Sequence, residues 1–175
     1  MPSKSNRRNA WKTRELFNSN QEEIEMSDKL PHDVYLAGPF FNEEEVAFVD
    51  KLAALLEKIG LKVYNPKEEG GILGETAPWE KASEIFEEDC RGIRGSEIIL
   101  AIIDDFDPGT IWEMGYAHAL GKPIITISNH GYGLNIMLSE SSRAHYQSIE
   151  DLKEAMENFF SQGIIPFKPW KGEIR

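Results

Sequence analysis

The sequence has a single cysteine, Cys90, among its 175 residues, and one thiol cannot close a disulfide within the chain. Such sparing use of cysteine is typical of proteins in the reducing cytosol. No apolar run approaches the roughly 20 residues that cross a bilayer. The N-terminus also lacks the apolar core of a signal peptide. We therefore expect a cytoplasmic protein that does not bind a membrane.

Basic residues are scarce too, with 19 Lys and Arg against 30 Asp and Glu, which gives a formal net charge of −11. This surplus of negative charge repels polyanions, so we expect no binding to nucleic acid polymers. A small neutral or cationic molecule remains as the expected kind of ligand. With 41% apolar residues, the chain is large enough for one domain with a real core.

Residues 1–30 form a polar N-terminal extension, basic early and acidic later, with weak periodicity. This pattern indicates a flexible arm, or a short helix that packs only in an oligomer. We assign residues 31–175 to one domain, because a regular alternation of strands and helices begins there.

Apolar strands are predicted over 34–38, 61–66, 97–103 and 123–128, with a short last strand over 144–148. Helices are predicted over 43–59, 79–94, 108–120 and 149–162, and a long loop over 67–78. Asn42 caps the first helix, with Glu45 at the capping-box position, and Gly60 ends it. The alternation predicts an α/β fold, a doubly wound parallel sheet with helices on both faces.

In such folds ligands bind beyond the carboxyl ends of the strands. There the sequence places "AGPFFN", "NPKEEGG", "DDFDPG" and "SNHGYGLN". Three of these four segments carry acidic or amide side chains beside glycines, which suits a polar ligand.

Two carboxylates lie on helix faces that should point inward. Glu113 shares a face with Ala117 and Leu120, and small residues on this helix should let it approach the sheet closely. Asp89 lies four residues from both Ile85 and Ile93, within the apolar stripe of the preceding helix, to which Ala82 and Phe86 also belong. Buried carboxylates are costly unless they are paired, hydrogen-bonded or functional.

Structural explanations compete with a functional one. Glu113 is also a first-turn acid, which the helix dipole favours. Asp107, followed by a proline, is a good N-cap and needs no further role. Asp89 has Arg91, Arg94 or another basic side chain as a candidate ion-pair partner. The spacing alone leaves these alternatives open.

Four motifs together resemble the nucleoside 2-deoxyribosyltransferases, over roughly residues 33–138: "VYLAGPFF", "DCRGIRGSEIILAI", "DPGTIWEMGYAHALGKPII" and "LNIM". The resemblance implies a flavodoxin-like fold. It also implies the transfer of 2-deoxyribose between nucleobases, as in nucleotide salvage, without a metal or organic cofactor. The substrates would be a 2′-deoxynucleoside and a free nucleobase.

The resemblance also implies roles for individual residues. Glu113 matches the family's nucleophile, Asp89 and Asp107 match its active-site aspartates, and Tyr35 matches a tyrosine beside the nucleophile. Residues at substrate-binding positions are Gly38, Pro39, Phe40, Gly109, Asn135 and Met137. Asn135 and Met137 match residues that a neighbouring subunit contributes, so a homodimer or a higher homo-oligomer is expected.

Two other functions compete with the transferase. A nucleoside or deoxynucleoside 5′-monophosphate N-glycosidase would share the fold and the carboxylates. Such enzymes often carry a Gly-Ser-Arg-type phosphate-binding turn after the first strand, whereas "AGPFFN" has no basic side chain. A non-catalytic nucleotide-binding module would have no need to keep a nucleophile such as Glu113.

Overall fold

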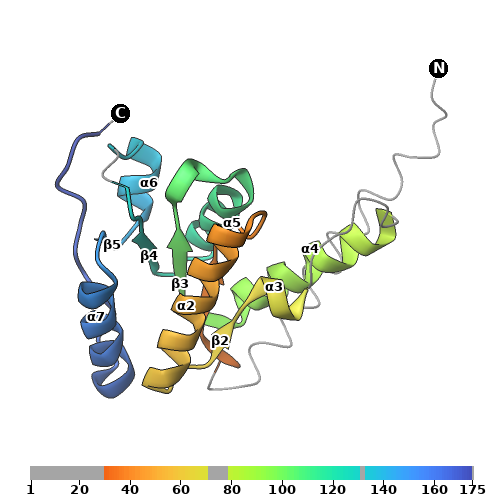
Figure 1. The fold of residues 1–175 in the computed structure, drawn as a ribbon, viewed down its shortest axis with the longest axis horizontal. Coiled ribbons are helices and arrows are strands. Elements are labelled where there is room, and N and C mark those ends of the chain that lie inside the picture. The colour runs from red at the N-terminus through yellow and green to blue at the C-terminus, as the bar shows by residue number, and fades with distance from the viewer. Residues whose placement is uncertain (1–29, 71–78, 131–132, 175) are drawn as a thin grey trace. The chain divides into compact units, whose positions relative to one another are not determined.

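The computed structural model describes residues 30–70, 79–130 and 133–174 (Figure 1). Nearly all of the expected N-terminal extension and residues 71–78 of the expected long loop lie outside the described residues. From Pro31 onward the chain packs as one unit.

The sheet has five parallel strands in the order β2-β1-β3-β4-β5. The strands are β1 His32–Ala37, β2 Val63–Tyr64, β3 Ser96–Ile102, β4 Ile124–Ile127 and β5 Ala144–Tyr146. This is the flavodoxin-like order, so the predicted fold class is confirmed. The strand order reverses between β1 and β3, and in open α/β sheets a ligand crevice forms at that switch point.

Six α-helices connect or follow these strands in the described part of the chain. They are α2 Glu43–Ile59, α3 Pro66–Glu69, α4 Trp79–Arg94, α5 Pro108–Ala119, α6 Ile136–Ser141 and α7 Ile149–Gln162, and a 3-10 turn spans Asp104–Phe106. Helices α2 and α7 pack on one face of the sheet, and α4, α5 and α6 on the other.

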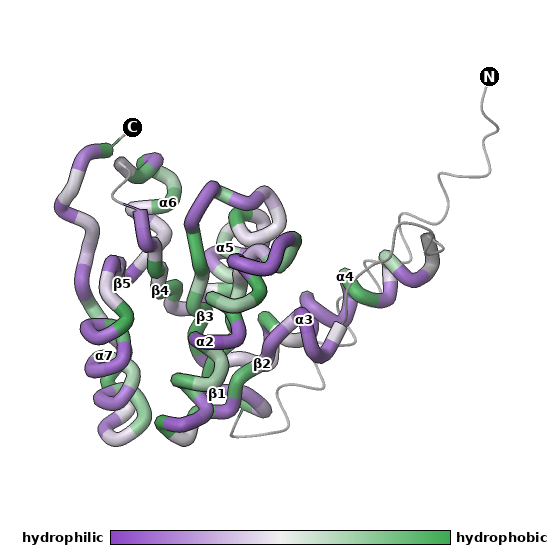
Figure 2. The backbone as a smooth tube through the Cα atoms, in the orientation of Figure 1, coloured by the Kyte–Doolittle hydropathy of each residue, from purple (hydrophilic) through white to green (hydrophobic). Residues whose placement is uncertain are grey.

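Alternation along β1 divides the core between the two faces. Val34 and Leu36 face α2, whereas Tyr35 and Ala37 face α4 and α5. Because both faces are covered, all four side chains are buried. The central strand β3 is hydrophobic along most of its length (Figure 2).

The residues predicted to cap the two ends of α2 do so in the structure. The Asn42 side chain accepts a hydrogen bond from the Glu45 backbone N–H at 3.0 Å, and the Glu45 carboxylate accepts one from Phe41 N–H at 2.7 Å. Gly60 ends the helix in the left-handed conformation, with φ 108°. This arrangement turns the chain back toward β2.

Two short helices depart from the predictions. Helix α3 occupies the start of the predicted loop, where Asn65 caps it and Pro66 is its first residue. Helix α6 was not predicted. Both helices have six residues or fewer, which is too short to display a helical period.

The apolar stripe predicted on α4 is buried only in part. Ile93 is fully buried, but Phe86 is 47% exposed. The helix reaches beyond the sheet with its N-terminal half (Figure 1), so only its C-terminal half has a sheet to pack on.

On α5, Ala117 is buried, whereas Gly115 and Ala119 face outward, so the prediction that small residues bring this helix close to the sheet holds for Ala117 alone.

None of the described helices is long and apolar enough to span a membrane. Within the same residues, no group of three or more His, Cys, Asp or Glu side chains is arranged to hold a metal ion.

Candidate active site

Three elements bring three of the four predicted catalytic side chains to one face of the sheet. Tyr35 lies in β1, Asp89 in α4 and Glu113 in α5, and these helices cover the same face of the sheet. The chain thereby collects groups that are far apart in sequence beside the switch point between β1 and β3.

Tyr35 and Glu113 form the central contact of this cluster. The Tyr35 hydroxyl donates a hydrogen bond of 2.5 Å to Glu113 Oε1. Tyr35 is fully buried and Glu113 is partly buried. A hydrogen bond this short to a carboxylate holds the side chain in one rotamer. The alternative explanation of Glu113 as a first-turn acid is wrong, because α5 begins at Pro108 and has no acidic residue in its first turn.

The surroundings raise the pKa of Glu113 to about 8. Burial is the largest cause, the hydrogen bond from Tyr35 opposes it, and the negative charges of Asp89 and Asp107 raise the pKa further. The ionised carboxylate is therefore a higher-energy and more reactive species than an ordinary surface glutamate.

Asp89 is a second carboxyl group with an altered pKa, raised to about 6 by burial and then by the charge of Glu88. Its Oδ1 atom is buried without a hydrogen-bond partner. Among the described residues Asp89 forms no ion pair, because Arg91 pairs with Glu88 and Arg94 donates to Tyr116. The predicted alternative of an Asp89 ion pair with either arginine is therefore wrong.

Asp107 does cap α5. Its Oδ2 atom accepts hydrogen bonds from Thr110 N–H at 2.7 Å and from the Thr110 hydroxyl at 3.0 Å. Asp107 also lies near enough to Glu113 to raise its pKa. Gly109 follows in the exposed first turn of the helix. The structure thus confirms that Asp107 caps α5, and the negative charge of the same side chain lies near Glu113, the candidate nucleophile.

The turn after β1 brings the predicted substrate-binding residues to the carboxyl edge of the sheet. A Cβ atom on Gly38 would lie 2.8 Å from Ile102 Cδ1, so this position has no room for a side chain. Pro39 is buried, and Phe40 stacks on the exposed Phe41 with ring centroids 5.8 Å apart. The turn therefore presents aromatic surface rather than charge.

Asn135 and Met137 lie at the start of α6. The Asn135 side chain caps the helix by accepting a hydrogen bond from Met137 N–H at 2.9 Å. Met137 is 74% exposed and Ile136 is 53% exposed. These two apolar side chains project from the surface of the described chain.

Tyr64 belongs to this cluster, although no sequence pattern indicated a functional role for it. It pairs with Tyr35 across β1 and β2, and the two rings stack at 5.2 Å with an interplanar angle of 10°. The only sequence signal was a tyrosine near the end of each of two strands, and their adjacency depends on strand order and register.

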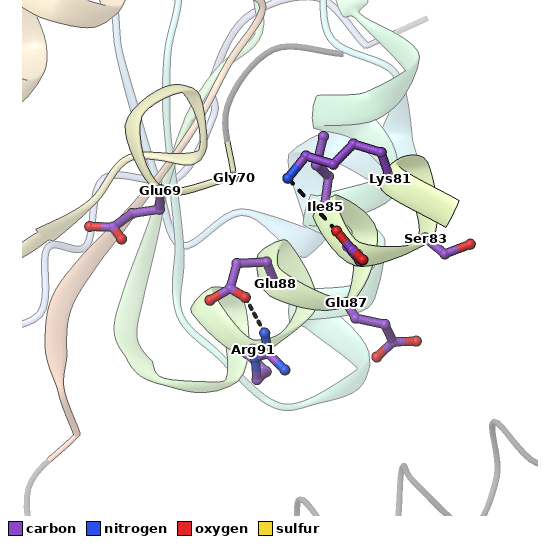
Figure 3. Close-up of a pocket in the computed structure, with 9 residues that line it drawn as sticks. Glu69, Gly70, Lys81, Ser83, Ile85, Glu87, Glu88 and Arg91 are labelled. Atoms are coloured by element: carbon purple, nitrogen blue, oxygen red, sulfur yellow. Dashed lines mark hydrogen bonds and ion pairs between the residues drawn. The ribbon is translucent and has the colours of Figure 1, made fainter. Parts of the chain in front are cut away.

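Two cavities are rich in carboxylates, and the first of them adjoins the cluster. The first, of about 490 Å³, lies between α3 and α4 (Figure 3). It adjoins Asp89 through Gly70, where a Cβ atom would lie 3.2 Å from Asp89 Oδ1. Its lining residues are Glu69, Gly70, Lys81, Ser83, Glu84, Ile85, Glu87, Glu88 and Arg91.

The second cavity, of about 460 Å³, lies beside the turn after β1, and Pro39 is one of its lining residues. Glu44, Glu45, Asp104 and Asp105 also line it. Tyr35 and Glu113 line neither cavity.

The fold and these side chains define a flavodoxin-like α/β protein with two carboxyl groups of raised pKa at the switch point of the sheet. Residues 34–145 match the family model of the nucleoside 2-deoxyribosyltransferases. The chain belongs to this family, whose members are enzymes.

Two curated relatives are similar in sequence to this chain. A nucleoside deoxyribosyltransferase of Limosilactobacillus fermentum is 27% identical over 161 residues, which cover 79% of this chain and 92% of the relative. An uncharacterized protein of Ureaplasma parvum is 35% identical over 108 residues, or 57% of this chain and 66% of that protein. The chain thus spans slightly less than two thirds of the Ureaplasma protein.

Solved structures are similar as well. A 2-deoxyribosyltransferase from Bacillus psychrosaccharolyticus superposes with a TM-score of 0.70 at 33% identity, covering 79% of this chain and 99% of the other. A conserved protein from Enterococcus faecalis has a TM-score of 0.63 at 20% identity, covering 73% and 98%, and this likeness concerns the fold alone.

Proposed function

We propose that this protein is a nucleoside 2-deoxyribosyltransferase, which moves 2-deoxyribose from one nucleobase to another through a covalent ester on Glu113. The observation that carries the proposal is the 2.5 Å hydrogen bond from Tyr35 to Glu113, within a cluster of carboxyl groups at the ligand-binding edge of the sheet.

In the first half-reaction, an oxygen of the Glu113 carboxylate attacks C1′ of the deoxyribose from the face opposite the base. The C–N bond to the base breaks, and a glycosyl ester forms. Tyr35 holds the attacking carboxylate in position through its hydrogen bond to Oε1. Because the other oxygen is not engaged by Tyr35, it is the oxygen we assign to the attack.

The departing base needs a proton, because a nucleobase anion is a poor leaving group. Asp89 is the proposed acid, since its raised pKa keeps a substantial protonated fraction near neutral pH. The negative charge of Asp89 also raises the pKa of Glu113, and with pKa values of about 6 and 8 the two groups together carry about one proton between pH 6 and 8, mostly on Glu113. The reactive form has this proton on Asp89 and the charge on Glu113.

In the second half-reaction, another base attacks C1′ of the ester and releases the Glu113 carboxylate. Asp89 takes back the proton that the incoming base loses. Two inversions restore the original configuration at C1′, as in retaining glycosidases, with a base in place of water as the acceptor.

The charge around the site favours a nucleoside over a nucleotide. The turn after β1 has no basic side chain, and the adjoining cavity is lined by Glu44, Glu45, Asp104 and Asp105. These carboxylates would repel a 5′-phosphate. The 5′-monophosphate N-glycosidase is therefore the less favoured of the two functions.

The proposed site is completed in a homo-oligomer. Met137 is exposed at the start of α6, and Asn135 is adjacent to it. Burial of this apolar surface against a second copy would bring both residues to the neighbour's site and would stabilise the assembly.

A base-exchange assay tests the proposal. The protein is incubated with a deoxynucleoside and a second free base, and products are separated by chromatography, with 5′-monophosphates as a parallel substrate set. We expect the exchanged nucleoside, its loss in Glu113→Gln, and normal activity in Glu154→Gln, a matched change of an exposed glutamate on α7. Release of free deoxyribose without any exchange product would contradict the transferase and favour the hydrolase.

A further inference from the structure

Tyr64 is a buried aromatic residue whose surroundings suggest more than packing. It is 4% exposed. One face of its ring stacks on Tyr35 at 5.2 Å, and the His32 ring meets it edge-on at 5.3 Å. Strand pairing of Tyr35 with Tyr64 fixes this arrangement, so the ring has little freedom to move.

The ring also lies against the face of α4 that carries Asp89. A Cβ atom on Gly92 would lie only 2.5 Å from the Tyr64 ring, so the ring touches the helix backbone at this point. Gly92 is three residues after Asp89, and residues with that spacing share a helix face. The Tyr64 side chain and the Asp89 carboxyl group are therefore neighbours on one surface of α4.

Each of these two neighbours has a buried polar atom without a partner. The Tyr64 hydroxyl oxygen and Asp89 Oδ1 are both buried, and neither forms a hydrogen bond of regular geometry among the described residues. Unsatisfied buried polar atoms are rare and costly. Here a hydrogen-bond donor lies next to an acceptor, and a small movement of either side chain would satisfy both.

From this geometry, we propose that Tyr64 is a positioning residue that donates a hydrogen bond to the Asp89 carboxylate after Asp89 has protonated the departing base. This inference rests on the proposed transferase function. The O–H bond of Asp89 breaks, its proton passes to the base, and the new carboxylate accepts a hydrogen bond from the Tyr64 hydroxyl. The proton returns to Asp89 from the incoming base, and Tyr64 keeps its own proton throughout.

Tyr64 is suited to donate without losing its proton. Its pKa is raised above the ordinary value by burial first, and then by the negative charges of Asp89, Glu88 and Glu69, with Arg91 opposing them. The pKa of Asp89 is in turn lowered by the Tyr64 hydroxyl, against the larger effects of burial and Glu88. The site thus contains two tyrosine–carboxyl pairs, Tyr35 with Glu113 and Tyr64 with Asp89, whose tyrosine rings stack on each other.

A direct test measures the pKa of Asp89 by NMR titration of protein labelled with ¹³C at the aspartate carboxyl groups, with Asp89→Asn to assign the signal. Tyr64→Phe removes the hydroxyl and keeps the ring stack. We expect it to raise the Asp89 pKa by roughly half a unit or more. The matched control is Tyr146→Phe, a buried tyrosine on the opposite face of the sheet, which should leave the Asp89 pKa unchanged. An unchanged Asp89 pKa in Tyr64→Phe would overturn the proposal.

Kinetics provides a second readout. In Tyr64→Phe the kcat for base exchange should fall by roughly 3- to 10-fold with little change in KM, because the hydrogen bond forms only as charge develops on Asp89. Tyr146→Phe should keep the wild-type kcat, and an equal loss in both variants would mean that Tyr64 acts only through stability. If the wild-type protein exchanges no bases, the proposed function fails, yet a shifted Asp89 pKa would still support the contact.

Discussion

Replacing Tyr35 with phenylalanine removes one hydroxyl group and almost nothing else. The ring is fully buried and stacks on Tyr64, so phenylalanine should occupy the same place. The change deletes the 2.5 Å hydrogen bond to Glu113, which is the main interaction that favours the charged form of that carboxyl group.

The size of the effect follows from the kind of hydrogen bond that is lost. A hydrogen bond to a charged group contributes about 1.5–3 kcal/mol, and 1.36 kcal/mol corresponds to one pKa unit. The pKa of Glu113, about 8 in the wild type, should therefore rise by roughly 1–2 units in Tyr35→Phe. At pH 7 the ionised fraction would fall from about one tenth by a further 10- to 100-fold, and kcat/KM for base exchange with it.

The assay is kcat/KM for base exchange between about pH 5 and 9.5 for the wild type and Tyr35→Phe, with circular dichroism to confirm the fold. Since the loss arises from protonation of Glu113, whose pKa is the higher of the two, the ratio of wild-type to variant activity should shrink above about pH 8, and the alkaline limb should move to higher pH. A loss of the same size at every pH would refute this account and leave orientation as the role of Tyr35. A loss below threefold at pH 7 would refute any catalytic role for that hydroxyl.

Further predictions concern the rest of the site. Exchange activity should be bell-shaped in pH with its maximum between about 6 and 8, because below this range both carboxyl groups are protonated and above it both are ionised; a flat profile from about pH 5 to 9.5 would contradict the assignment. Because the pKa of Glu113 is raised, its ionisation destabilises the fold as the pH rises from 4.5 through about 8. In urea unfolding, Glu113→Gln should therefore be more stable than the wild type by on the order of a few kcal/mol at pH 8.5, and by little at pH 4.5. Equal differences at both pH values would count against this. Asp107→Ala should lose the helix cap and about 1 kcal/mol of stability, whereas Asp107→Asn should keep the cap and, by lowering the pKa of Glu113, move the alkaline limb to lower pH; thermal unfolding and the pH profile separate the two effects. Gly38→Ala should lower the free energy of unfolding by about 1–3 kcal/mol, because the new Cβ would meet the Ile102 side chain at 2.8 Å. A melting temperature equal to that of the wild type would show that the turn can shift to make room for the methyl group.

Much of the fold could be predicted from local pattern. The helix over 43–59 was recognisable from its cap, its period and Gly60, and each of these signals acts within one or two turns of chain. Helices α3 and α6 were missed because they are too short to show a period. Phe86 was placed in a buried stripe because periodicity reports a common face, but does not report where the sheet beneath that face ends.

The candidate site was predictable to a similar extent. Spacing placed Glu113 and Asp89 on inward faces, and the family resemblance added Tyr35. The position of Tyr64 was not predictable, because nothing in "LKVYNP" tells which strand will lie beside it. Its contact with Tyr35 follows from the pairing of β1 with β2 in a specific register.

By itself the sequence determined the kinds of element, their caps and the inward direction of two carboxyl groups, since these depend on residues within a few positions of each other. Only the tertiary structure decided that Tyr35 reaches Glu113 across 78 positions of sequence. It also decided that burial raises the pKa of Glu113 and Asp89, and that Tyr64 lies against both Tyr35 and the Asp89 face of α4. Desolvation and long-range contacts depend on what surrounds a group in space, and strand order and helix packing supply those surroundings.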